Sequence, residues 1–308
     1  MLCERPFSCP DSLLAGFPEA AEPMAIVAAN SAVVMESARD ASARGLIEPI
    51  LIGPPAIITR LAEEMQWDLS GIKVVPTASE EEAAHAGVSM VRSGEARLLM
   101  KGHLHTNVLM RAVLDRYAGL RTGRRVSHVF HMSVPYSRRE LMITDAAVNV
   151  APDLQTKIDI VRNATDLARA LGYERPRVAL LSATEEPSNG IPSSVEAAAV
   201  MKTLTENGGH DFDICGPLAF DNAVSPAAAR LKGIVHPVAG HADILVMPNI
   251  ETGNALFKMM VHFMGATAGG VVLGATVPIV LTSRADPAEA RLASTALARR
   301  MAAVVPGT

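Results

Sequence analysis

Residues 24–39 of the chain, MAIVAANSAVVMESAR, decide how it is expected to fold. An apolar run opens into small residues and then into the more polar residues 36–39, which is typical of a strand, a tight turn and a helix that ends near residue 44. The alternation of strand and helix continues downstream with short connections, which predicts a mostly parallel sheet. The expected strands are 47–52, 72–75 and 96–100, and the expected helices are 57–65 and 80–92.

The second half of the chain shows the same alternation of strand and helix patterns. Residues 149–154, which include Pro152, are the expected crossover between two lobes. The long apolar stretch 269–282 contains glycines and Pro278, so it is too short for a membrane-spanning helix and is expected to be buried strand. Further strands are expected at 177–181, 244–247 and 277–282, and helices at 193–206 and 286–303, with Pro287 in the first turn of the last helix.

The composition agrees with this architecture. The 308 residues are 49% hydrophobic but only 4% aromatic, so aliphatic side chains must fill the core, which suits helices packed on a sheet. We therefore predict an α/β protein with two α/β lobes. The first lobe is residues 1–148, completed by a C-terminal helix at 286–308, and the second lobe is residues 149–285.

Charge and cysteine content exclude several classes of protein. The formal net charge of −4 does not fit a broadly basic nucleic-acid binder. Cys3, Cys9 and Cys215 form no CxxC pair, which indicates a reducing, cytoplasmic setting. Residues 4–11 carry charges and prolines before any sustained apolar run, so no signal peptide is expected. We expect neither a nucleic-acid nor a membrane partner.

The first candidate site begins at Lys101 and Gly102, directly after an apolar strand. Ligands of open α/β sheets gather at the carboxyl ends of strands. A glycine lets backbone N–H groups approach an anion, and Thr106 is placed to cap the helix that carries Arg111. An ordinary strand-to-helix turn explains the same residues, so both interpretations stay open.

His103 and His105 in the same segment raise the question of a metal. Alternate residues of an extended segment point the same way, so a His-x-His pair can chelate zinc. No third ligand with suitable spacing follows. We therefore predict hydrogen-bonded or solvated histidines and no metal site.

Two further segments carry groups suited to phosphate. Arg121 lies in the basic run 120–125, and the planar guanidinium fork matches phosphate groups. Asp145 and Asn149 flank three apolar residues just before the expected crossover. A solvated basic face and a capping aspartate at a strand end are the structural alternatives.

Polar residues also follow the apolar strands of the second half. Asn222 follows the block GPLAFD at 216–221, and Asn254 ends the segment PNIETGN at 248–254. Core packing does not require such richness in Asn, Asp and Gly, although separate turns explain each one singly. We include both asparagines among the candidate substrate-binding residues.

Residues 277–286, VPIVLTSRAD, join a buried strand to Ser283, Arg284 and Asp286. A Ser-x-x-Asp cap explains the serine and the aspartate. It does not explain Arg284, because a positive charge near a helix N-terminus is unfavourable unless an anion is bound. Arg284 is therefore the most informative candidate for binding an anion.

Taken together, these segments resemble the phosphate acetyl/butyryltransferase family, and its butyryltransferase branch in particular. The resemblance covers about 24–303 and rests on the blocks at 101–111, 120–123, 216–223 and 277–286. It implies two α/β lobes of the isocitrate/isopropylmalate dehydrogenase-like type, an active-site cleft between them, and a homodimer. It also implies reversible transfer of a short acyl group between acyl-CoA and inorganic phosphate, giving an acyl phosphate, without a metal or bound organic cofactor.

The resemblance also assigns roles. Ser283 and Arg284 match the Ser-Arg pair of the family's site, and Arg111 matches its first-lobe substrate arginine. Where the family has an acid, this chain has Ala290, so Asp286 or Glu289 must take its place. We predict that Ser283, Arg284 and Asp286 are catalytic. The predicted substrate-binding residues are Lys101, Gly102, Thr106, Arg111, Arg121, Asp145, Asn149, Asn222 and Asn254.

Two other functions stay open at this point. One is a metal-dependent NAD(P) dehydrogenase of the isocitrate/isopropylmalate type, because residues 236–243 are similar to the nucleotide loop of those enzymes. Their metal site needs a cluster of aspartates on consecutive helix turns, which we do not find. The other is a catalytically silent coenzyme A sensor. No G-x-x-x-x-G-K-[ST], G-x-S-x-G or H-E-x-x-H motif is present, which disfavours nucleotide hydrolysis, lipase-type and zinc-protease chemistry.

Overall fold

The structure is a computed structural model that describes residues 3, 7–17, 20–135, 137, 139–206, 208, 210–281 and 286–304. The chain divides into two compact units. Unit 1 is Met1–Pro6 with Arg125–Ala268, and unit 2 is Phe7–Arg124 with Gly269–Thr308. Unit 2 is therefore assembled from two distant pieces of sequence, whereas nearly all of unit 1 is one continuous piece.

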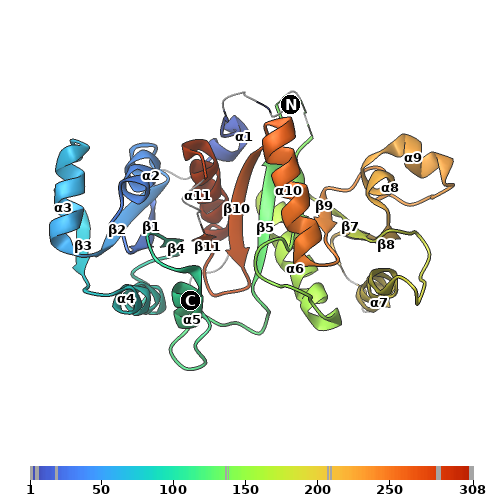
Figure 1. Ribbon diagram of the computed structural model, residues 1–308, viewed down its shortest axis with the longest axis horizontal. Coiled ribbons are helices and arrows are strands. Elements are labelled where there is room, and N and C mark those ends of the chain that lie inside the picture. The colour runs from blue at the N-terminus through green and yellow to red at the C-terminus, as the bar shows by residue number, and fades with distance from the viewer. Residues whose placement is uncertain are drawn as a thin grey trace. The chain divides into compact units, whose positions relative to one another are not determined.

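Mostly parallel strands form the centre of unit 2, in the order β3-β2-β1-β4-β11-β10 (Figure 1). All the pairings along β3-β2-β1-β4-β11 are parallel, and β10 pairs antiparallel with β11. Residues 24–27 are fully buried, as expected for a strand covered on both faces. The strands are β1 (Glu22–Val27), β2 (Ile47–Gly53), β3 (Lys73–Pro76), β4 (Leu98–Lys101), β10 (Thr267–Leu273) and β11 (Ile279–Leu281).

Helices cover the strands of unit 2. α2 packs against β2 and α11, and α4 packs against β1, β2 and β4 and against α5. In Figure 1, α4 and α5 lie below these strands and α2 lies above them. Gly87 lets α4 approach closely, because a Cβ there would lie 2.6 Å from Cγ2 of Val27. The helices are α1 (Asp11–Leu14), α2 (Ala32–Ala43), α3 (Pro55–Glu64), α4 (Glu80–Arg92), α5 (Thr106–Val113) and α11 (Ala288–Ala302).

Unit 1 has strands in the order β5-β6-β9-β7-β8. β5 and β6 are antiparallel, and the pairs β6–β9, β9–β7 and β7–β8 are parallel. The strands are β5 (Ser127–Ser133), β6 (Leu141–Thr144), β7 (Arg177–Leu181), β8 (Asp213–Leu218) and β9 (Ile244–Val246). The helices are α6 (Leu154–Ala170), α7 (Pro192–Glu206), α8 (Phe220–Val224), α9 (Pro226–Leu231) and α10 (Ile250–Met264).

Alternate residues of β5 face different helices of unit 1. Phe130 stacks on Phe257 of α10, with ring centroids 4.1 Å apart. Ser127 faces the other way, and its Oγ accepts a hydrogen bond of 2.9 Å from Nδ2 of Asn163 on α6. The period-two alternation of a strand therefore places α10 and α6 on opposite faces of β5. Across the described part of the chain, we find no helix whose length and apolar content would let it cross a bilayer.

Most of the expected elements are confirmed. The helix expected at 80–92 is α4 with the same bounds, and the strand expected at 177–181 is β7. The expected helix at 193–206 starts one residue earlier, at Pro192. The mostly parallel pairing is also as predicted.

Two expectations were wrong in detail. The stretch 269–282 is not one buried strand, because Gly274, with φ of +90°, turns β10 back antiparallel into β11. Pro287 is the residue before α11 rather than part of its first turn. Residues 149–154, the expected crossover, lead into α6, where the Asp153 side chain accepts from the N–H of Thr156 at 2.8 Å.

The division into units falls at 124/125 and 268/269 rather than at the predicted lobe boundaries of 148/149 and 285/286. Residues 125–148 pack with unit 1 because β5 and β6 form a hairpin whose second strand pairs with β9. Whether domains that fold independently end at the predicted boundaries stays a prediction.

Candidate active site

The carboxyl ends of β4 and β11 meet at one edge of unit 2. The two strands are parallel neighbours, and Leu281 is the register partner of Lys101. Lys101 is half-buried, and its Nζ donates to the carbonyl of Gly102 at 3.3 Å. The predicted catalytic residues Ser283 and Arg284 follow Leu281 in the sequence and lie outside the described residues.

Gly102 supports the close approach of two strand ends. A Cβ at this position would lie 2.4 Å from the carbonyl oxygens of both Val27 and Ala28. The N–H of Gly102 donates to Val27 at 2.8 Å, and the N–H of His103 donates to Ala28 at 2.9 Å. Because both N–H groups are used inside the protein, Gly102 serves backbone packing here rather than presenting N–H groups to an anion.

Thr106 does not cap α5, contrary to the expectation. It is the first residue of the helix, and His105 precedes it without a side-chain capping bond. The N–H of His105 is instead held by Oε2 of Glu80 at 3.0 Å. Arg111 lies five residues after Thr106 and is exposed, so the two side chains point about 140° apart around the helix axis.

Arg121 is exposed at the end of a loop held against the turn between β10 and β11. Its backbone forms an antiparallel bridge with Ala275, and Oγ1 of the next residue, Thr122, donates to the carbonyl of Gly274 at 2.6 Å. The basic run therefore has a fixed backbone, while the Arg121 side chain faces solvent.

Asp145 organises the loop that follows β6 in unit 1. Its Oδ1 accepts from the N–H groups of Ala147 and Val148 at 2.9 and 3.0 Å. Its Oδ2 accepts from the N–H of Asn149 at 3.2 Å and from Nδ2 of the same residue at 2.7 Å. Nδ2 of Asn149 also donates to Val126 at 2.9 Å. The carboxylate is 2% exposed, so Asp145 and Asn149 are brought together as a buried scaffold for this loop.

His128 lies beside Asp145 on the antiparallel hairpin. β5 and β6 pair Val129 with Thr144, and Oγ1 of Thr144 donates to the carbonyl of His128 at 2.9 Å. The His128 ring is 2% exposed, and its centroid is 4.2 Å from that of Phe130. Among the described residues, its Nδ1 has no hydrogen-bond partner. Burial lowers the pKa of His128 to about 4, although the charge of Asp145 opposes this shift. The ring is therefore neutral at pH 7.

The start of α10 packs directly on the Asp145 loop. A Cβ on Gly253 would lie 2.8 Å from the carbonyl oxygen of Asp145. Nδ2 of Asn254 donates to the carbonyl of Ala146 at 3.4 Å. Asn249 caps the helix by accepting from the N–H of Thr252 at 3.0 Å. The structure thus brings Asp145, Asn149 and Asn254 together at the carboxyl end of β6.

Asn222 lies farther along the strand order, after β8. It is fully buried, and its Nδ2 donates to Oε1 of Glu185. Its own Oδ1 has no partner in the part of the chain that the structure describes. Oε2 of Glu185 accepts from Lys232 Nζ at 3.3 Å. In the sheet, β9 and β7 lie between β6, which the Asp145 loop follows, and β8, which Asn222 follows.

Sequence reasoning missed Glu185 and His128. Glu185 follows the apolar strand 177–181 within a few residues, so the argument used for Asp145 would have found it. His128 had no comparable signal, because only the pairing of β5 with β6 places it beside Asp145.

The two candidate acids after Arg284 have different surroundings. Glu289 lies in the first turn of α11, and its Oε2 accepts from the N–H of Cys9 at 2.9 Å. The carbonyl of Asp286 accepts from Nη1 of Arg291, whose Nε donates to Oγ of Ser37 at 2.6 Å. Glu289 is therefore used to hold the N-terminal segment of unit 2. Within the described residues, no group of three or more His, Cys, Asp or Glu side chains is arranged to hold a metal ion.

Comparison with known proteins now identifies the family. Residues 77–299 match the family described as phosphate acetyl/butaryl transferase. A phosphate acetyltransferase of Rhizobium meliloti is 51% identical over 265 residues, which cover 86% of this chain and 84% of that protein. A phosphate butyryltransferase of Clostridium acetobutylicum is 38% identical over 279 residues, covering 91% and 93% of the two chains.

Comparison with solved structures leads to the same family. A branched-chain phosphotransacylase from Enterococcus faecalis superposes with a TM-score of 0.80 at 32% identity, covering 91% of this chain and 99% of that one. A 4-hydroxythreonine-4-phosphate dehydrogenase from Burkholderia phymatum gives a TM-score of 0.55 at 15% identity, which shows a shared fold alone. The comparisons do not support the dehydrogenase alternative. The chain belongs to the phosphate acetyl/butyryltransferase family and is an acyltransferase of that family.

Proposed function

We propose that this enzyme transfers a short acyl group reversibly between coenzyme A and inorganic phosphate by direct attack of phosphate on the thioester. A phosphate oxygen bonds to the carbonyl carbon, the carbon–sulfur bond breaks, and the coenzyme A thiolate leaves and takes up a proton. The observation that carries the proposal is the parallel register of Leu281 with Lys101. It supports a site in which residues 283–286 and the loop after Lys101 start from the same edge of unit 2.

In this proposal Arg284 grips the phosphate with its planar fork, and Ser283 donates to phosphate or to the oxyanion of the tetrahedral intermediate. Binding both substrates together converts a dilute encounter into an oriented one, which can contribute roughly 7–11 kcal/mol. An oxyanion donor in comparable sites contributes about 2.7–4 kcal/mol. Lys101, Thr106, Arg111 and Arg121 would hold the anionic substrates from unit 2. Asp145, Asn149, Asn222 and Asn254 shape the strand ends of unit 1.

We propose further that the two lobes are of the isocitrate/isopropylmalate dehydrogenase-like type, and that the enzyme works without metal or organic cofactor in the cytoplasm. The fold shared with 4-hydroxythreonine-4-phosphate dehydrogenases supports this type of architecture. The free thiols of Cys3, Cys9 and Cys215 agree with a reducing compartment.

The test of the reaction is phosphate-dependent thiol release from acetyl-, propionyl- and butyryl-CoA. We expect turnover with at least one of them, no turnover without phosphate, and an unchanged rate after exhaustive treatment with EDTA. Loss of activity with EDTA that a divalent ion restores would contradict the proposal of metal-free catalysis. Coenzyme A binding without turnover on any short acyl-CoA would favour a silent sensor instead.

Asp286 is the residue that we propose for the proton transfer, because it follows Arg284 by two residues in the sequence, whereas Glu289 lies in the first turn of α11. We expect Asp286→Asn to lower kcat by about 10²–10⁴-fold, the usual contribution of a general acid–base. Glu289→Gln keeps an oxygen for Cys9 and should change kcat by less than about threefold. Steady-state thiol release at saturating substrates measures both. The opposite ranking of the two variants would assign the proton transfer to Glu289.

We also propose a homodimer that uses the exposed apolar face of α10. Ala255, Met259 and Phe263 recur at helical spacing, and the last two side chains are 44% and 57% exposed. Such a face is unusual for a helix that meets only water. It supports a partner copy as the occupant.

Light scattering at micromolar concentration should give twice the 32.5 kDa chain mass. The double variant Met259→Lys, Phe263→Lys should be largely monomeric, because two charges cannot be buried unpaired. Val235→Lys is the matched control, since Val235 is 98% exposed in unit 1 but lies in a loop. A monomeric wild-type protein would refute the dimer, and a dimeric double variant would remove α10 from its interface.

A further inference from the structure

Arg291 places a buried guanidinium near the start of α11. The residue is 7% exposed, and the helix begins three residues earlier, at Ala288. A positive charge is unfavourable near a helix N-terminus, and a buried charge is costly unless hydrogen bonds satisfy it. The contacts of this side chain therefore show what it does in the fold.

Two neutral oxygen atoms accept hydrogen bonds from the Arg291 side chain. Its Nε donates to Oγ of Ser37 on α2 at 2.6 Å. The hydroxyl of Ser37 donates to the carbonyl of Val33 at 2.7 Å, so its oxygen is left to accept from Arg291. Nη1 of Arg291 donates to the backbone carbonyl of Asp286. One planar group therefore ties residue 286 to α2, which is distant in the sequence.

The carbonyl of Asp286 lies outside the hydrogen bonds of α11. The N–H groups of Ala290 and Arg291 both donate to the carbonyl of Pro287, at 3.1 Å each, so the bonds of the helix begin one residue later. The helix alone does not hold residue 286 through this carbonyl. The contact from Arg291 extends the fixed structure to that residue.

α11 is itself held at both ends. In its first turn, Oε2 of Glu289 accepts from the N–H of Cys9 at 2.9 Å. In its last turn, the guanidinium carbons of Arg299 and Arg300 lie 4.4 and 4.5 Å from the ring centroid of Phe17. Figure 1 shows α1, which lies between Cys9 and Phe17 in the sequence, beside α11. The N-terminal segment of unit 2 therefore keeps this helix in place.

The position of Asp286 bears on the proposed site because it follows Arg284 by two residues. On the other side, β11 ends at Leu281, whose register partner is Lys101 on β4. The segment between them starts from a paired strand and ends at the residue that Arg291 holds. A shift of Asp286 is transmitted to Arg284 through two peptide units, and a misplacement of about 1 Å can lower a catalysed rate by roughly 10²-fold.

We infer that Arg291 is a positioning residue for acyl transfer. By tying the carbonyl of Asp286 to α2, it sets where Arg284 meets phosphate, and it touches no substrate itself. The inference rests on the proposed function, in which Arg284 binds the phosphate. A residue that only stabilises the fold would lower the free energy of unfolding and leave the kinetic constants of the folded enzyme unchanged.

The experiment measures phosphate-dependent thiol release by Arg291→Met, which keeps an unbranched apolar stem and removes the hydrogen-bond donors. We expect kcat/KM for phosphate to fall about 10²-fold, while KM for acyl-CoA changes by less than about threefold. Arg291→Lys should recover only part of the rate, because an ammonium group cannot reproduce the planar fork. Urea unfolding of each variant measures any loss of stability separately. A wild-type kcat/KM in Arg291→Met would overturn the inference.

A double-mutant cycle with Arg284→Ala tests the route of the effect. If Arg291 acts through Arg284, then Arg291→Met should lower kcat/KM by less than about threefold in the Arg284→Ala background. Equal fold-losses in both backgrounds would overturn the inference, because independent sites have additive effects. A wild-type protein without phosphate-dependent turnover would instead refute the proposed function, and the inference with it.

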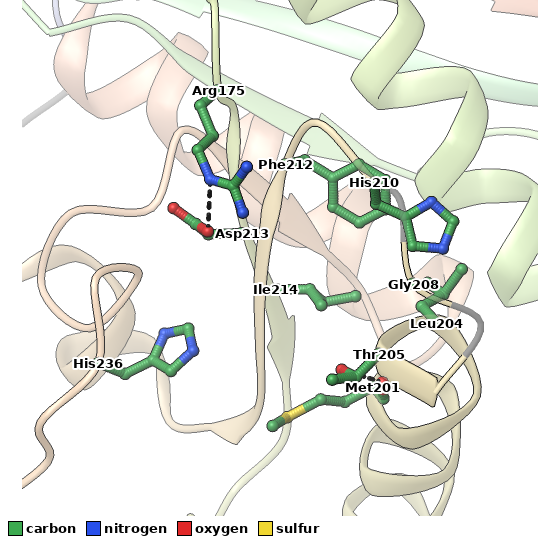
Figure 2. Close-up of a pocket in the computed structure, with 10 residues that line it drawn as sticks. All are labelled: Arg175, Met201, Leu204, Thr205, Gly208, His210, Phe212, Asp213, Ile214 and His236. Carbon is green, nitrogen blue, oxygen red and sulfur yellow. Dashed lines mark hydrogen bonds and ion pairs between the residues drawn. The ribbon is translucent and has the colours of Figure 1, made fainter.

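Ser37→Ala provides a second variant if Arg291→Met does not fold, because it removes only the acceptor of Nε. It should lower kcat/KM for phosphate by about twofold to tenfold, the range that one lost hydrogen bond spans. Arg175→Met in unit 1 is the matched control. Nε of Arg175 also donates, to Oδ1 of Asp213 at 2.8 Å, but this side chain is 58% exposed (Figure 2). Arg175→Met should keep the wild-type kinetics, and a loss equal to that of Arg291→Met would overturn the inference.

Discussion

Replacing Arg284 with Ala is expected to lower the rate of phosphate-dependent thiol release by about 10²–10³-fold or more, while the fold stays intact. A helix begins at Ala288, four residues after Arg284, and its N-terminus carries partial positive charge. A guanidinium near that end is unfavourable in an empty site. Bound phosphate interacts favourably with the guanidinium and with the helix N-terminus. Its charge-assisted contact with the guanidinium strengthens as charge develops in the transition state.

Two control variants test whether the effect requires a guanidinium group and whether it requires an arginine at this position. Arg284→Lys should recover only part of the rate, because an ammonium group cannot reproduce the planar fork. Arg60→Ala removes an arginine that is 61% exposed and paired with Glu64, and it should keep the wild-type rate. Thermal unfolding should show that phosphate stabilises the wild type more than Arg284→Ala. A near-normal rate in Arg284→Ala would remove this residue from the site.

His128 is expected to make the stability of the protein fall by about 3 kcal/mol between pH 7 and pH 4. Its pKa is about 4 in the fold against an ordinary value of 6.5. Between these values the unfolded chain binds a proton that the folded chain excludes, so the free energy of unfolding decreases as the pH falls. The loss is complete near pH 4, and above pH 6.5 the histidine makes no difference.

The measurement compares urea unfolding of the wild type and His128→Phe at several pH values from 7 to 4. The carboxylates remote from His128 titrate alike in both proteins, so the difference between the two curves reports the histidine together with its interaction with Asp145. His128→Gln provides a polar variant of smaller volume in case the larger ring overpacks beside Phe130. His85→Phe is the control, because His85 is exposed on α4 and its replacement should keep the wild-type slope. Parallel curves for the wild type and both His128 variants would show that this ring is not the source of acid sensitivity.

Periodicity was sufficient to find the elements whose pattern is local. α4 has three glutamates in its first turn, a serine that accepts from the N–H of Glu82, and a buried apolar face. All these signals lie within the helix and its N-cap Ser79, so the bounds of α4 were predicted correctly. The strands β1, β2 and β4 were found for the same reason, because buried parallel strands are short continuous apolar runs.

Long-range pairing was not available from the sequence. No local pattern shows that β6 pairs with β9, because that strand follows about 100 residues later in the chain. The register of the β5–β6 hairpin, which places His128 beside Asp145, is likewise not visible in the sequence. The candidate site was predicted from residue chemistry. Residue chemistry alone could not show that the N–H of Gly102 and the carboxylate of Asp145 already form hydrogen bonds within the protein.

The two-piece construction of unit 2 has a consequence for synthesis on the ribosome. β4 emerges early, but its neighbour β11 follows about 180 residues later, a separation that makes their pairing slow. Until then one side of β4 presents open backbone groups, the kind of edge on which chains aggregate. Unit 1 is nearly continuous and can complete its sheet in the interval. The nascent chain therefore has a period in which the open edge of β4 favours aggregation, and this period ends only when the last forty residues arrive.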